Sequence, residues 1–244
     1  MKKVILFAVL LLSIQQVGSC QVIKLKKPTI PGSGSTNNNA SNVSNTEMVS
    51  ALRDALSQGI NNGADKVSKT DGYFKNTAIK ILMPDDVKNV ESKLRQLGMG
   101  SMVDKAILSM NRAAEQAAKE SKPIFINAIK NMTITDAVSI LKGSDNAATT
   151  YLRNNTSVQL TEKFTPIIDK ALENTQATKY WSDVFTNYNK IPGVQKINPD
   201  LSKYVTQRAL DGLFKMIADE ELAIRKDPVA RTTDILKKVF GINW

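Results

Sequence analysis

Apolar residues recur every three or four positions over most of this chain, the spacing that places them on one face of an α-helix. The first such face follows Ser44, which has Glu47 three residues later, as in a capping box, and it comprises Val49, Leu52, Leu56 and Ile60. Asp71 and Gly72 interrupt the pattern. No alternating pattern of a strand follows, and only Ile79–Met83 reads as a short extended piece.

Further helices are predicted along the rest of the chain. The first three are expected from Pro84 to Gly98, from Ser101 through Ala117, and from Pro123 onward. A second capping box at Thr133–Asp136 starts a short helix that ends at Gly143. The remaining ones are expected over 145–154, 157–174, 177–189 and about 201–226. The helix over 201–226, capped by Asp200, is expected to be the longest. Pro166 predicts a kink or break, and a last helix is expected from Asp227-Pro228 to Gly241.

The first 44 residues follow a different pattern. Lys2 and Lys3, the apolar stretch Val4–Leu12 and the small residues Val17–Ser19 together indicate a secretory signal peptide over residues 1–19. Residues 20–44, rich in lysine, serine and asparagine, predict a flexible tether, because such a segment buries too little apolar surface to offset its ordering entropy. We therefore expect a signal peptide, a disordered leader and one all-α domain of about eight or nine helices over residues 45–244.

Cys20 is the only cysteine, and it follows small residues at the position where a bacterial lipoprotein carries its lipid. We expect an exported, periplasmic protein that is anchored to the outer membrane by a lipid on Cys20, with a soluble periplasmic protein as the alternative. A tether of this length spans roughly 25–30 Å on average. Its three lysines, Lys24, Lys26 and Lys27, suit anionic lipid headgroups.

The composition excludes several kinds of catalytic and metal-binding site. The chain has no histidine and no second cysteine, which excludes Ser-His-Asp and Cys-His catalysis, the usual zinc sites and an internal disulfide. We predict no catalytic residue, no metal site and no cofactor. The formal charge of +10 suits a neighbour such as anionic lipid or a polyanionic polymer. No nucleic-acid-binding module is visible, so no nucleic acid is expected among the partners.

Two short motifs read as coincidence or as surface chemistry. Ser139–Lys142 and Ser144–Asn146 have the spacing of motifs in penicillin-binding enzymes, but they lie too close together and the third motif is absent. Asp219–Glu221 is an acidic run whose members point about 100° apart on a helix, so they cannot close on one ion. Glu221 and Arg225 are expected to form an ordinary surface ion pair, while Glu220 can turn toward a basic group of another helix.

Arg112 and Glu115 flank an alanine-rich helix face and form the centre of the candidate site. We expect Arg112 to be buried against a carboxylate, with an anion clamp as the alternative. Arg231, with Thr232 and Thr233, is placed in the first turn of the last helix, where it either helps to cap that helix or holds an anion. The candidate binding or buried polar cluster comprises Asn111, Arg112, Glu115, Asp136, Glu220, Arg225 and Arg231.

Several separated segments resemble one family in the same order. They are Gly72–Phe74, Ile79–Pro84, Met110–Glu115, Asn131–Ala137, Tyr204–Thr206, Asp211–Phe214, Ile224–Pro228 and Val239–Gly241. Over about residues 48–243 the chain resembles the family catalogued as domain of unknown function 4197. The resemblance implies an exported, helical protein of Gram-negative envelopes. It brings no activity, ligand or catalytic residue.

These observations leave several hypotheses open. The first is a non-enzymatic binding or scaffold module that holds a protein partner, or an apolar or anionic ligand, between its helices. The second is a histidine-free hydrolase or transferase acting on envelope material, with Glu115, Asp136 and Glu220 as carboxylates and Arg112 assisting; it needs two of these carboxylates in one pocket. The third is a structural spacer on the membrane.

Overall fold

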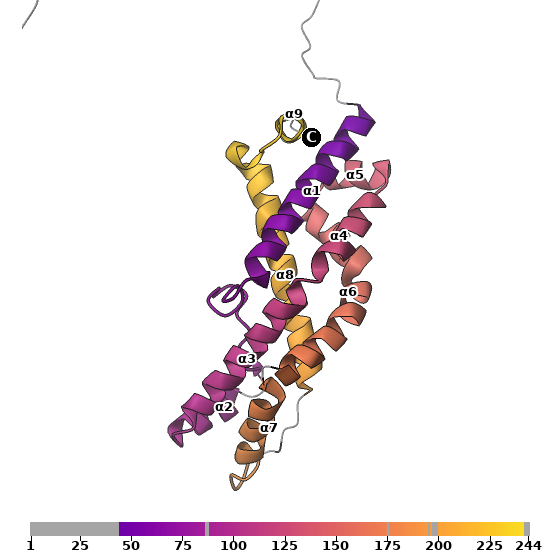
Figure 1. Cartoon of the computed structure of the whole chain (residues 1–244). Coiled ribbons are helices and arrows are strands. Elements are labelled where there is room, and N and C mark those ends of the chain that lie inside the picture. The colour runs from indigo at the N-terminus through magenta and orange to yellow at the C-terminus, as the bar shows by residue number, and fades with distance from the viewer. Residues whose placement is uncertain (1–43, 86–87, 175, 195, 197–199, 242–244) are drawn as a thin grey trace, which may run out of the picture. The chain divides into compact units, whose positions relative to one another are not determined.

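A computed structural model describes residues 44–85, 88–174, 176–194, 196 and 200–241 of the chain (Figure 1). The helices are α1 (Asn45–Ser68), α2 (Lys88–Gln96), α3 (Gly100–Ala118), α4 (Ser121–Lys130), α5 (Ile134–Leu141), α6 (Ala147–Asn174), α7 (Ala177–Tyr188), α8 (Leu201–Lys226) and α9 (Asp234–Phe240), with a 3₁₀ turn, η2 (Pro228–Ala230). Over these residues there is no strand, which confirms the all-α prediction. The predicted signal peptide, Cys20 and all but the last residue of the tether lie outside the described residues.

The core is built around α8, which packs along both α1 and α6 (Figure 1). Helix α3 crosses α6 and also contacts α1, α7 and α8. Close approach is possible because its inner face is mostly alanine, including Ala113, Ala114 and Ala117, which are fully buried. Phe125 of α4 meets Phe214 of α8 edge-on, with ring centroids 5.6 Å apart. Trp181, Phe185 and Tyr188, which share one face of α7, are likewise buried in the core.

The predicted helix starts are confirmed where a side chain caps them. The side chains of Ser44 and Thr133 each accept a hydrogen bond from the backbone N–H of the third residue of the following helix. The acidic side chain of that third residue accepts in turn from the backbone N–H of the cap residue, which completes both capping boxes. Asp200 accepts from the backbone N–H of Lys203, and α8 has the predicted bounds. Each such cap stabilises its helix by about 1 kcal/mol.

Of the kink or break predicted at Pro166, the break is wrong, and the two helices expected over 145–154 and 157–174 are one. One helix of 28 residues runs from Ala147 to Asn174 with Pro166 inside it, so α6 is longer than α8, which has 26 residues. Proline removes one backbone hydrogen bond. Thr161 and Thr165 donate hydrogen bonds from their hydroxyls to carbonyls four residues earlier, and Phe164 and Ile168, on either side of Pro166, are buried in the core. Packing on both sides of the proline therefore outweighs the lost bond.

The last helix also differs from the prediction, because two caps replace the expected single start. Asp227 accepts from the N–H of Val229 and starts the 3₁₀ turn η2, while Thr233 accepts from the N–H of Leu236 and starts α9. The helix that was expected from Pro84 is described only from Lys88, since residues 86–87 lie outside the described residues.

Among the described helices, none alone has both the length and the apolar character needed to cross a bilayer. Helices α4 and α5 meet the criterion only when taken together, and they are bent by 105° relative to each other.

Candidate functional site

The segment between α1 and α2, residues 69–85, is called the docked loop here. It contains turns and irregular backbone, yet Tyr73, Ile79, Ile81 and Met83 are buried. Tyr73 is fully buried, and its hydroxyl donates to the carbonyl of Ala209 in α8 at 2.6 Å. Burial raises the pKa of this phenol, so Tyr73 is neutral and serves as a donor. Its ring occupies the space beside Gly212, where a Cβ atom would lie 2.6 Å from the ring.

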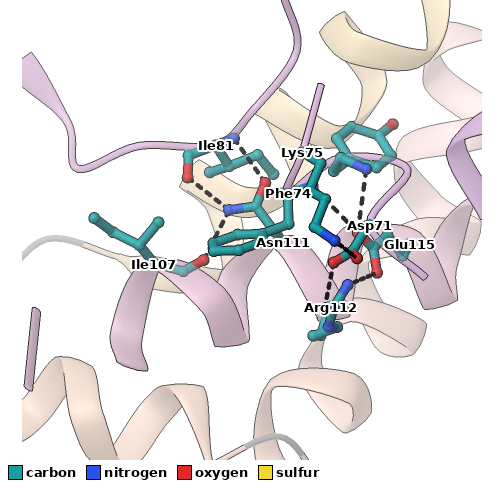
Figure 2. A network of polar contacts seen from close by, with 9 residues as sticks. Asp71, Phe74, Lys75, Ile81, Ile107, Asn111, Arg112 and Glu115 are labelled. Carbon is teal, nitrogen blue, oxygen red and sulfur yellow. Dashed lines mark hydrogen bonds and ion pairs between the residues drawn. The ribbon is translucent and has the colours of Figure 1, made fainter. Parts of the chain in front are cut away.

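Asn111 of α3 attaches the docked loop because its side-chain amide pairs with both the N–H and the carbonyl of one loop residue, as the backbone of a neighbouring strand would (Figure 2). Its side-chain oxygen accepts from the N–H of Ile81 at 2.9 Å, and its amide nitrogen donates to the carbonyl of Ile81 at 2.7 Å. The same nitrogen donates to the carbonyl of Ile107 at 2.7 Å. Asn111 is fully buried, so these bonds satisfy loop backbone that water cannot reach.

Glu115, one turn further along α3, holds the other end of the docked loop (Figure 2). One carboxylate oxygen accepts from the N–H groups of Tyr73 and Phe74, at 3.1 and 3.2 Å. The other accepts from the guanidinium of Arg112 at 2.7 Å. Glu115 is buried, so its charge depends on this set of three donors.

Arg112 joins Glu115 to Asp71, whose carboxylate lies 2.6 Å from the guanidinium. Lys75 contacts the other oxygen of Asp71 at 2.9 Å. Hydrogen bonds from Lys75 and Arg112 hold the pKa of Asp71 below its usual value. Two cations and two anions therefore alternate, and the guanidinium of Arg112 is occupied by two carboxylates. The geometry is that of a clamp on the docked loop, with the charges compensated internally.

A second buried pair, Glu221 and Arg225, lies on α8. This pair was expected on the surface, and that prediction is wrong: the two side chains are only 6% and 10% exposed. Glu221 accepts from the N–H groups of Ala148 and Thr149 at 2.9 and 2.8 Å, so it caps the N-terminus of α6 from another helix. Arg225 donates to Glu221 and to the carbonyl of Ile140 near the end of α5.

Arg231 lies before α9 and not in its first turn, contrary to the prediction. Its guanidinium donates to the carbonyls of Ile224 and Arg225 at 3.0 and 2.8 Å. It therefore caps the C-terminus of the preceding helix, α8, where a cation is favoured by the helix dipole.

The remaining candidate residues lie elsewhere. Asp136 stays in its capping box with Thr133, and Glu220 forms an ion pair with Lys66 of α1. The three carboxylates that a hydrolase would use, Glu115, Asp136 and Glu220, thus have separate partners on separate elements. Within the described ranges, no three His, Cys, Asp or Glu side chains come together as metal ligands would.

The outer side of the docked loop and α8 enclose a groove of about 400 Å³, which we call the loop–α8 groove. It is lined by residues 78–83 and by Asp85, Lys88, Tyr204, Arg208, Asp211, Gly212 and Lys215. Across the groove lining, the hydroxyl of Tyr204 donates to the carbonyl of Leu82 at 2.8 Å. Burial raises the pKa of Tyr204, which keeps this donor neutral.

Four cations and two carboxylates line the loop–α8 groove. Lys88 pairs with Asp85, Lys215 with Asp219 outside the groove, and Asp211 with Arg153. Among the residues that the structure describes, Lys80 and Arg208 form no ion pair. Each lies over an aromatic ring instead: the amine of Lys80 is 4.2 Å from the centre of Phe74, and the guanidinium of Arg208 is 5.5 Å from that of Tyr204.

Lys80 and Arg208 could not be predicted as neighbours from the sequence, because the two residues are far apart in the chain and belong to no motif. The available signal was indirect. The segments Ile79–Pro84, Tyr204–Thr206 and Asp211–Phe214, which carry the family resemblance, come together at this groove.

Comparison with curated proteins and with solved structures finds no match. The model of one family, described as a protein of unknown function (DUF4197), matches residues 42–241, which is most of the chain and includes every element described above. The chain therefore belongs to this family.

Proposed function

We propose that this protein is a non-enzymatic binding module whose loop–α8 groove takes an anionic ligand with an apolar portion. The observation that carries the proposal is that Lys80 and Arg208, from two different elements, line one groove and form no ion pair among the described residues. A carboxylate or phosphate is the partner that such cations lack, and arginine matches its two oxygens in a bidentate geometry.

The apolar side of the groove supports an amphiphilic ligand. Ile79 and Met83 line it from the docked loop, and Leu82 is 51% exposed beside them. An exposed leucine next to cations suits a ligand whose charged head is followed by a hydrocarbon portion. The aromatic rings under Lys80 and Arg208 restrict both side chains before the ligand arrives, so less side-chain entropy is lost on binding.

A binding role is favoured over the hydrolase alternative by the contacts of the carboxylates. Glu115 already accepts hydrogen bonds from backbone N–H groups and from Arg112. Asp136 accepts from Thr133 in its capping box, and Glu220 forms an ion pair with Lys66. A pair of carboxylates that shares one substrate, as general acid and base catalysis requires, is not formed by these three residues.

The groove is tested by binding of dihexanoyl phosphatidic acid, with dihexanoyl phosphatidylcholine as a ligand of equal chain length and no net charge. We expect binding of the first, and at least a tenfold weaker affinity in the double variant Lys80→Gln/Arg208→Gln. The matched control is Lys93→Gln/Lys119→Gln, which removes the same charge from exposed sites outside the groove. Equal losses in both variants, or equal binding of both lipids, would refute the proposal.

We further propose that the module is exported and held at the outer membrane by a lipid on Cys20. The support is the sequence pattern of residues 1–20 and the lysine-bearing segment that follows it. Metabolic labelling with a radioactive fatty acid should label the protein, and Cys20→Ala should abolish the label and release the protein from the membrane fraction. A Cys20→Ala variant that keeps the label contradicts this assignment.

A further inference from the structure

A second and larger depression lies between α6, α7 and α8, and we call it the three-helix groove. One part, of about 580 Å³, is lined by α7 and by the facing ends of α6 and α8. A second part, of about 440 Å³, continues between α6 and α8. Asp169, Asp200 and Ser202 line both parts, so the two are continuous.

The larger part of the three-helix groove is acidic although the chain as a whole has a formal charge of +10. Asp169, Glu173 and Asp200 line this part, with no lysine or arginine among its described lining residues, whereas Lys203 lines the smaller part. Over the described ranges, none of these three carboxylates forms an ion pair. One oxygen of Asp200 accepts from the N–H of Lys203 as the cap of α8. The larger part of the groove thus carries negative charge that no ion pair among the described residues neutralises.

Hydroxyl and amide side chains line the rest of the groove, and two of the threonines in the smaller part offer acceptors only. Thr161 and Thr165 have already donated their protons to backbone carbonyls, each at 2.8 Å, so only their lone pairs are left for another molecule. Thr206 is 4% exposed, and its hydroxyl, like that of Ser202, is buried without a hydrogen-bond partner among the described residues. Buried hydroxyls of this kind are normally satisfied by a partner or a ligand.

The floor of the larger part is apolar and aromatic. Leu172, Trp181, Phe185 and Leu201 line it and are themselves buried. The rings of Trp181 and Phe185 lie 4.7 Å apart. An indole is the aromatic group that attracts a cation most strongly, and the hydrocarbon portion of a ligand gains by covering such a floor.

We propose that the three-helix groove binds an alkylammonium group, that is, a primary amine on a short hydrocarbon chain. An ammonium brings three donors and a positive charge, which complements three carboxylates that form no ion pair among the described residues. The negative charge of the larger part disfavours an anion, and a neutral saccharide would leave that charge uncompensated. The amine belongs either to a free diamine or polyamine or to a lysine side chain of a partner protein. This inference concerns a different site and does not rest on the anion-binding proposal.

Titration with 1,5-diaminopentane tests the inference, with 1,5-pentanediol as the neutral ligand of similar shape. Replacing Trp244 by Phe leaves Trp181 as the only tryptophan, so its fluorescence reports on the floor of the groove. We expect saturable binding of the diamine and none of the diol. The variant Asp169→Asn/Glu173→Gln should weaken diamine binding at least tenfold, while Glu120→Gln/Glu162→Gln, which removes two exposed carboxylates elsewhere, should change it less than threefold.

Two acetylated and amidated tripeptides, Gly-Lys-Gly and Gly-Gln-Gly, identify the source of the amine. Binding of the lysine peptide with the same dependence on Asp169 and Glu173 supports a partner's lysine, and binding of the diamine alone supports a free amine. The inference is overturned if neither binds, if the diol or glucose binds as well as the diamine, or if the control variant loses as much affinity as the groove variant.

Discussion

Replacing Asn111 by Asp changes one atom in the clamp on the docked loop, and it is the sharpest test of that clamp. The new oxygen would stand where the amide nitrogen donates to the carbonyls of Ile81 and Ile107, each at 2.7 Å. Two attractive contacts would become repulsive, and a negative charge would be placed at a position that is fully buried. The other side-chain oxygen still accepts from the N–H of Ile81, so the backbone has no steric reason to move.

The size of the effect follows from protonation. The protein can avoid the buried charge by protonating the new carboxyl, whose unfolded pKa of about 3.9 makes this cost about 4 kcal/mol at pH 7. The lost donor bonds add about 1–2 kcal/mol. Asn111→Asp should therefore lower the free energy of unfolding by about 5–6 kcal/mol at pH 7.

The stability of Asn111→Asp should fall as pH rises. The folded state raises the pKa of the new carboxyl, so between the unfolded and folded pKa values the folded state binds one proton more than the unfolded state. Stability is then lost as pH rises, by about 1.4 kcal/mol for each unit above about pH 4. Near pH 4 the variant should lose only the 1–2 kcal/mol of the donor bonds.

Urea unfolding followed by circular dichroism at pH values from 4 to 7.5 measures this difference against the wild-type protein at each pH. Asn154→Asp, at an exposed position on α6, is the matched control and should change stability by less than about 0.5 kcal/mol at every pH. Asn111→Leu should lose stability without dependence on pH. A loss below about 1 kcal/mol at pH 7 for Asn111→Asp, or an equal loss at pH 4 and pH 7, would refute the role given to Asn111.

Three further predictions concern other contacts. Gly212→Ala should destabilise by about 1–3 kcal/mol, since its Cβ would lie 2.6 Å from the Tyr73 ring, whereas Gly63→Ala, with its nearest atom at 3.6 Å, should stabilise by about 0.5–1 kcal/mol; thermal melts separate the two signs. Glu221→Gln should cost about 2–4 kcal/mol in urea unfolding, because the charge that caps α6 from within the core is lost; an unchanged midpoint contradicts this. Hydrogen bonds from Lys238 and Ser44 lower the pKa of Glu47 to about 2. Glu47 therefore stabilises the folded state above its unfolded pKa, and this contribution is lost as pH falls toward 2. Glu47→Gln should flatten that part of the stability–pH curve, and an unaltered slope argues against this role.

The helices themselves were largely predictable, because the signals that start and end a helix are local. The bounds of α8 followed from Asp200 and the three- and four-residue spacing, and both capping boxes form as expected. The break that was one of the two outcomes predicted at Pro166 does not occur, because the helix continues. A proline argues against a helix locally, but burial of Phe164 and Ile168 on either side decides the outcome, and that burial depends on helices far away in the chain.

For the polar residues, too, the sequence indicates local pairs but not the distant partners. Arg112 and Glu115 were recognisable as a pair three residues apart, yet nothing local indicates that Asp71 and the backbone of Tyr73 are their partners. Glu221 and Arg225 have the spacing of a surface ion pair, and they are buried only because the N-terminus of α6 lies against them. The same limit applies to Lys80 and Arg208, which share a groove across 128 positions of sequence.

By itself, the sequence determined that the chain is helical, where most helices begin and end, which family it belongs to, and which chemistries a protein without histidine excludes. Only the tertiary structure decided which polar side chains are buried, which pairs compensate each other, and where charge is left without an ion pair. The physical reason is that helical spacing determines which residues share a face, whereas the burial and the partners of that face depend on what packs against it. For Lys80, Arg208 and the carboxylates of the three-helix groove, that information lies in other helices and loops.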